Sequence, residues 1–92
     1  MAKQPQDARQ ADQEADRRQW RTAAIGTHVL SALGAPDELR EVQVRPLWQD
    51  FYRVNILVGA DAVSVRVAHS YFLTADGEGN VLRSAPEITR LY

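Results

Sequence analysis

The sequence predicts an α+β fold. One N-terminal helix packs on one face of a three- to four-stranded antiparallel meander sheet, in the order α-β-β-β-β, and the chain ends in a short C-terminal helical turn. Two observations lead to this prediction. Apolar residues recur every three to four positions before Pro36 and every second position after it. Turn-forming residues then divide the alternating part into short segments. An apolar helix stripe and an apolar strand face can bury each other, which gives two layers.

The apolar residues also divide the 92-residue chain, which is short enough for one domain. Apart from Met1, every large apolar side chain lies at or after Trp20. Residues 1–19 have good helix formers but no apolar face, so they cannot bury surface of their own. We therefore interpret 1–19 as a disordered or frayed helical tail and 20–92 as a single α+β domain.

The helix is expected from Trp20 to Leu33. Ile25, Val29 and Leu33 repeat every four residues and form its apolar stripe. Gly34 can take the left-handed conformation that ends a helix, and Pro36 follows two residues later.

Two strands are expected next. In Leu39–Arg45, Val42 and Val44 alternate with polar residues, which is typical of a half-buried strand, and Pro46 ends it or places it at an edge. Phe51–Val58 alternates in the same way and forms the second strand.

The third strand is expected over Val63–Thr74, after a turn at residues 59–62. A hairpin with this four-residue loop pairs Val58 with Val63 and Ile56 with Val65, and it collects the β-branched side chains on one face. The opposite face then collects the following pairs: Leu57/Ser64, Asn55/Arg66, Arg53/Ala68 and Phe51/Ser70.

The C-terminal part begins with a turn over Asp76–Asn80, rich in residues that tolerate positive φ, and a short strand over Asn80–Arg83. Ser84 and Glu87 have the spacing of a helix capping box. We expect one or two helical turns after it, or an extended tail.

The composition limits the chemistry. Without cysteine the chain has no disulfide and no thiolate metal site, and two histidines offer little for another, so we expect no metal and no cofactor. The first twenty residues contain no apolar segment of a secretory signal, and four acidic residues argue against a transit peptide. No apolar run is long enough to cross a membrane, so we expect a cytoplasmic protein without membrane contact.

Catalytic patterns are weak. His69 and Ser70 are neighbours, but adjacent strand residues point to opposite faces. The acidic residues are scattered, and no nucleophile elbow, dinucleotide-binding or phosphate-binding loop is present. The segment from Asp76 has calcium-ligand residue types, but an EF-hand needs glycine where Val81 stands. We expect a non-enzyme.

The sheet face away from the helix is the candidate site. It carries apolar and basic side chains that one helix cannot cover. A domain of about 73 residues also has a small core, so binding to a partner would stabilise it. We expect this face to bind another protein or a second copy of the chain. Its expected residues are Phe51, Arg53, Asn55, Leu57, Arg66 and Phe72, with Trp48, Trp20 or Ile88–Tyr92 as additions.

Single-stranded nucleic acid is the alternative ligand for the same face, through stacking on its aromatic rings. The net charge of −1 and the equal numbers of acidic and basic residues in 39–92 argue for the protein partner.

The element order resembles that of the PepSY module, a helix followed by a small antiparallel sheet with a glycine turn and short strand, here Gly79-Asn80-Val81-Leu82. It also resembles the double-stranded RNA-binding domain, although the last helix of that domain begins with lysines where this chain has Ser84-Ala85-Pro86-Glu87. A likeness of order concerns the fold and carries no function.

Overall fold

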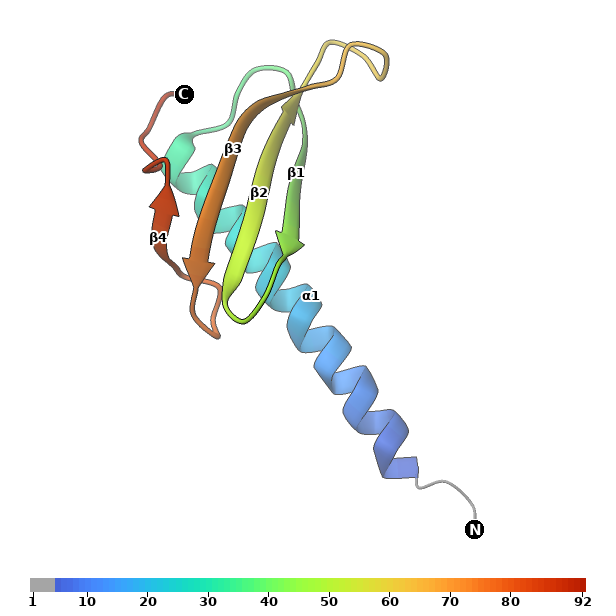
Figure 1. Ribbon diagram of the computed structural model, residues 1–92. Helices are drawn as coiled ribbons and strands as arrows, with labels where there is room; N and C mark the ends of the chain where they lie inside the picture. Colours follow the sequence, from blue (N-terminus) through green and yellow to red (C-terminus); the bar gives the residue numbers. More distant parts are fainter. Residues whose placement is uncertain (1–4) are drawn as a thin grey trace.

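A computed structural model describes residues 5–92 of the chain, with side chains from residue 13 onward. It contains one helix and one antiparallel sheet with the strand order β1-β2-β3-β4 (Figure 1). The elements are α1 (Pro5–Leu33), β1 (Leu39–Pro46), β2 (Phe51–Val58), β3 (Arg66–Ala75) and β4 (Val81–Ala85). The α+β meander that the sequence predicts is confirmed.

Helix α1 crosses one face of the sheet, and its N-terminal half continues past the sheet into solvent (Figure 1). The helix ends where the sequence predicts. Gly34 has φ 87°, and its amide donates to the Leu30 carbonyl. A helix of 29 residues is about 43 Å long, which is more than the sheet can cover. The predicted boundary at residue 20 lies within this helix, and the part of the predicted tail in residues 1–4 lies outside the described residues.

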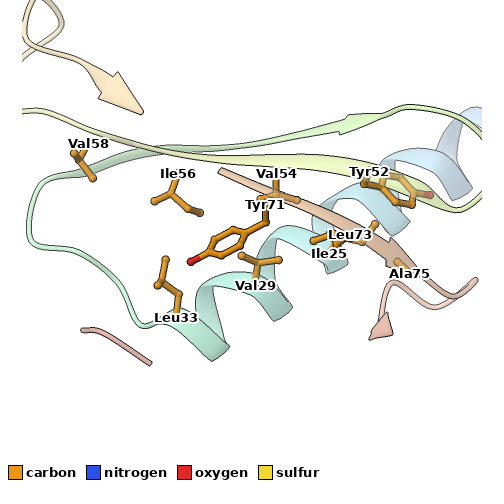
Figure 2. Close-up of a cluster of buried hydrophobic side chains, with 10 residues drawn as sticks. All are labelled: Ile25, Val29, Leu33, Tyr52, Val54, Ile56, Val58, Tyr71, Leu73 and Ala75. Atoms are coloured by element: carbon orange, nitrogen blue, oxygen red, sulfur yellow. The ribbon is translucent and has the colours of Figure 1, made fainter. Parts of the chain in front are cut away.

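The core lies between α1 and the inner side of the sheet (Figure 2). Ile25, Val29 and Leu33 are completely buried, as their spacing predicts. From the sheet they meet the following residues: Tyr52, Val54, Ile56, Val58, Tyr71, Leu73 and Ala75. Burial raises the pKa of Tyr71 above that of a free tyrosine.

The first two strands follow the prediction closely. β1 pairs with β2, and Val42 and Val44 lie opposite Ile56 and Val54 on the side that faces α1. A Cβ atom at Gly26 of α1 would lie 3.5 Å from both of these valine side chains, so the helix approaches β1 closely there.

The predicted register of the second hairpin is wrong. Val58 pairs with Arg66 rather than Val63, and Ile56 pairs with His69 rather than Val65. The strand begins only at Arg66, and Val63 is 95% exposed in the loop. The Asp61 carboxylate accepts hydrogen bonds from the amides of Val63 and Ser64, which holds this segment in a turn. The register that forms buries Tyr71 and Leu73, which remove more apolar surface from water than valines do.

A β-bulge interrupts the pairing of β2 with β3 near the loop of this hairpin. The register shifts between Ile56 and Leu57, and Val67 becomes the partner of Leu57. Because of the extra residue, Val67 follows Leu57 to the outer face, where it is exposed.

The predicted C-terminal helical turn is also wrong, since residues 86–92 are irregular. Ser84 belongs to β4, and its hydroxyl accepts from the Ile88 amide at 3.3 Å instead of capping a helix. The amides of Leu91 and Tyr92 donate to the Leu33 carbonyl. These bonds hold the last two residues against the end of α1, where they satisfy a carbonyl of its last turn.

Helix α1 is too polar to cross a membrane, and it is the one helix within residues 5–92.

Candidate functional site

The outer face of the sheet, which points away from α1, is called the open face here. Alternation along the strands and the pairing of partners define it. Its residues are Glu41, Gln43 and Arg45 of β1, Phe51, Arg53, Asn55 and Leu57 of β2, Val67, Ser70, Phe72 and Thr74 of β3, and Arg83 and Ala85 of β4.

Three aromatic rings lie together at one end of the open face. Phe51 and Phe72 stack with ring centroids 5.4 Å apart and an interplanar angle of 28°. Trp48 lies 5.6 Å from Phe51 and 6.1 Å from Phe72. We call these three residues the aromatic cluster. Its outermost member, Trp48, keeps 59% of its surface exposed, so the cluster presents an apolar surface to solvent.

The turn between β1 and β2 positions Trp48. The Phe51 amide donates to the Trp48 carbonyl, and the Leu47 amide donates to the Phe51 carbonyl. Between them Gln49 has φ 48°, a left-handed conformation that non-glycine residues seldom adopt. This tight turn brings the indole back over the strands that carry the two phenylalanines.

A row of polar side chains extends from the cluster. The guanidinium of Arg53 lies 5.9 Å from the centre of the Phe72 ring, within the range of a cation–π contact. Its Nη1 donates to the Ser70 hydroxyl at 3.3 Å, and that hydroxyl donates to Oδ1 of Asn55 at 2.7 Å. Only one of the guanidinium nitrogens is used in a hydrogen bond, so most of the N–H groups of Arg53 are free for another acceptor.

The charge on the open face differs from that of the whole chain. Arg45, Arg53 and Arg83 lie on it, whereas Glu41 is its single acidic residue. Arg45 and Arg53 are direct cross-strand partners. Arg83 borders a hollow of about 240 Å³ beside Phe51 and Phe72. The aromatic cluster therefore lies among arginines, a composition found at the centres of protein interfaces.

Five of the six predicted site residues share the open face: Phe51, Arg53, Asn55, Leu57 and Phe72. Leu57 lies at the other end of β2, opposite Val67. The prediction for Arg66 is wrong because it depended on the wrong register. Arg66 pairs with Val58 instead of Asn55 and borders a hollow with Asp37 and Glu38 near the end of α1.

Of the three additions, only Trp48 joins the open face. Trp20 lies on the exposed side of α1, and it too is 59% exposed. The Ile88–Tyr92 segment packs at the end of α1, where the Tyr92 hydroxyl lies 2.8 Å from Nε2 of His69.

The two histidines make structural contacts. His69 faces α1 and stacks on Tyr71, whereas the neighbouring Ser70 faces outward. The ring nitrogen Nδ1 of His28 lies 2.6 Å from the Gly79 carbonyl, so this nitrogen must carry the proton. Within the described residues, no three His, Asp or Glu side chains are grouped to hold a metal ion.

Sequence reasoning missed a second surface, a groove of about 720 Å³ between α1 and the outer edge of β1. Small residues line its helix side, among them Ala15, Ala23 and Gly26, and Val42, Val44 and Pro46 line its strand side. Arg18, Gln19 and Leu30 line the same side, so no continuous run of small residues in the sequence marks this groove.

No family model matches the chain, and no curated protein or solved structure matches it significantly.

Proposed function

We propose that this chain is a non-catalytic, cytoplasmic protein-binding domain and that its contact surface is the open face of the sheet. The observation that carries the proposal is the aromatic cluster of Trp48, Phe51 and Phe72, in which Trp48 is exposed to solvent and the Arg53 guanidinium lies over the Phe72 ring. Tryptophan and arginine are the residues most enriched among those that dominate binding energy in protein interfaces.

The partner surface follows from the same residues. The aromatic cluster can pack against an apolar side chain of the partner, and removing both surfaces from water is favourable at about 25 cal/mol per Å² of apolar area. Arg45, Arg53 and Arg83 surround the patch and favour carboxylates on the partner, because a guanidinium binds a carboxylate through two parallel hydrogen bonds. The expected partner segment is therefore apolar at its centre and acidic at its rim.

Site-specific photo-cross-linking in the native cell tests the proposal. A photoreactive phenylalanine analogue replaces Trp48 in one variant and Trp20 in a matched control, since the two indoles have the same exposed fraction. We expect position 48 to capture a defined protein that position 20 does not capture, and R53A to reduce the yield. Equal capture from both positions, or none from position 48, contradicts the proposal.

Single-stranded nucleic acid is a second candidate ligand, and one observation favours it: arginines outnumber acidic residues on the open face three to one, counting Arg45, Arg53 and Arg83 against Glu41. Aromatic rings beside arginines form stacking platforms for bases. Fluorescence anisotropy with a labelled single-stranded oligonucleotide at low salt decides between the ligands. Binding tighter than about 10⁻⁴ M that W48A abolishes supports nucleic acid; no binding leaves the protein partner.

A further inference from the structure

Strand β1 is an edge of the sheet, and nothing in residues 5–92 pairs with its outer side. An edge strand keeps a row of backbone N–H and C=O groups that can pair with another strand. β1 has eight residues, against five in the opposite edge strand β4. β1 is therefore the longer of the two backbone templates that the sheet offers.

We propose that β1 pairs antiparallel with β1 of a second copy of this chain, about a twofold axis that passes through Gln43. The two sheets then form one eight-stranded sheet, and the two α1 helices lie on the same side of it. Twofold pairing uses the same surface on both copies, so that surface must complement itself.

The β1 sequence complements itself in this register. Glu41 lies opposite Arg45 of the second copy, and the symmetry makes this ion pair twice. Both residues are on the open face, where their side chains can meet. Val42 lies opposite Val44 of the second copy on the side that faces the helices, again twice. Gln43 meets itself on the axis, where its amide can donate and accept.

The neighbouring registers, in which the twofold axis passes one residue to either side of Gln43, do not pair Glu41 with Arg45 of the second copy. An axis through Val42 puts Val44 opposite Arg40, and an axis through Val44 puts Gln43 opposite Arg45. Neither register brings opposite charges together. Charged residues on an edge strand usually oppose pairing with other chains, but here they select one register with a second copy.

The groove beside β1 has room for the second copy. It extends along α1 from Ala15 to Leu30, on the flank next to the edge of the sheet. In the twofold arrangement the α1 helices run antiparallel beside each other along this groove. Ala15 and Ala23 keep part of this flank small, and the longer side chains of Arg18, Gln19 and Leu30 line the rest of it. The N-terminal half of α1, which continues past its own sheet on the β1 side (Figure 1), then lies along the other copy.

A single cysteine tests the axis position, because the chain has no cysteine of its own. In Q43C the two thiols lie on the axis, and directly opposite Cα atoms are about 4.5–5.5 Å apart, within disulfide range. The matched control is R83C, on the other edge strand. We expect mild oxidation of the full chain to convert Q43C to a covalent dimer at least tenfold faster than R83C. Equal rates overturn the proposal.

Charge exchange tests the register. Sedimentation of the full chain is measured between about 1 µM and 1 mM, the concentration range of weak to moderate affinities. We expect a dimer that E41R and R45E each weaken at least tenfold, because either change places like charges opposite each other. The double variant E41R/R45E restores the pairing with reversed charges. Circular dichroism confirms that all three variants are folded.

Three results would overturn the proposal: a wild-type chain that is monomeric throughout this range, single variants that dimerise normally, or a double variant that stays dissociated. The open-face proposal is tested separately, because W48A removes part of the aromatic cluster and leaves β1 unchanged. If W48A dissociates the dimer and E41R does not, the two copies contact each other through the open face. This result would also contradict the β1 pairing.

Discussion

Gly79 packs directly on Ala24 of helix α1. A Cβ atom at position 79 would lie 2.6 Å from the Cβ of Ala24 and 3.1 Å from the Arg21 carbonyl. The glycine also has φ 79°, and its carbonyl accepts from His28 at 2.6 Å. The turn between β3 and β4 therefore lies so close to the helix that position 79 has no room for a side chain.

Substitution of this glycine should destabilise the fold. We expect G79A to lower the free energy of unfolding by about 2–4 kcal/mol, through the left-handed backbone and the overpacked contact with Ala24. G77A is the control, because a Cβ at position 77 meets nothing within 4 Å. Urea denaturation measures both variants, and similar losses for the two would refute the close contact.

The same turn predicts an acid-sensitive contribution to stability. The Asp76 carboxylate accepts hydrogen bonds from the Asn80 amide at 3.0 Å, the Asn80 side-chain amide at 3.1 Å and the Glu78 amide at 2.9 Å. These bonds, chiefly those from Asn80, lower the pKa of Asp76 below its ordinary value of 3.8. A lowered folded-state pKa stabilises the protein above pH 3.8, and the contribution disappears as the pH falls through the folded-state pKa.

We therefore expect D76N to be less stable than the wild type at neutral pH and the difference to shrink below about pH 4. D37N is the control, because the Asp37 carboxylate accepts no hydrogen bond within the described part of the chain. Thermal unfolding followed across pH 2–7 measures the difference. A gap that is constant over this range would contradict the prediction.

The turn that positions Trp48 can be tested at Gln49. This residue has a left-handed backbone, which costs a non-glycine residue about 1 kcal/mol. We expect Q49G to raise the free energy of unfolding by up to about 1 kcal/mol and Q49V, which is β-branched, to lower it. Chemical denaturation of the two variants measures this, and the reverse order would show that Gln49 is not left-handed.

The register of β2 and β3 makes opposite predictions for two apolar positions. Val63 is 95% exposed, so V63D should change the free energy of unfolding by less than about 0.5 kcal/mol. Leu73 is buried opposite Tyr52, so L73A should cost about 2–5 kcal/mol. The register expected from the sequence pairs Val63 with Val58. A large loss of stability in V63D would support that register instead of the observed one.

The sequence predicts elements whose signals are local. Ile25, Val29 and Leu33 have helical spacing, Gly34 ends the helix, and the strand with Val42 and Val44 has alternating residues, so the end of the helix and this strand lie where they are expected. The helix begins at Pro5 instead of Trp20, because its N-terminal part has no apolar stripe that marks it. The second hairpin depends on a choice between registers. The valines at 63, 65 and 67 fit a strand as well as Tyr71 and Leu73 do, and the turn at Asp61 and the bulge that decide between them leave no regular pattern.

In the candidate site, too, the residues placed by local signals are predictable and those placed by strand register are not. The open-face positions on β2 are predictable because alternation alone assigns their face. Arg66 is misplaced because its face depends on the register beyond the bulge. The approach of Trp48 to Phe72, which is 24 positions away in sequence, depends on the left-handed turn at Gln49 and on the pairing of β2 with β3. Neither can be read from the spacing of apolar residues.

The affinity of the captured protein for W48A and W20A, measured by isothermal titration calorimetry, tests the open-face proposal most directly. The two indoles have equal exposure, but only Trp48 belongs to the aromatic cluster. We expect W48A to weaken binding at least about thirtyfold, as for a residue that dominates an interface, and W20A to change it less than about threefold. A W48A variant that binds as tightly as the wild type would show that the open face is not the binding surface.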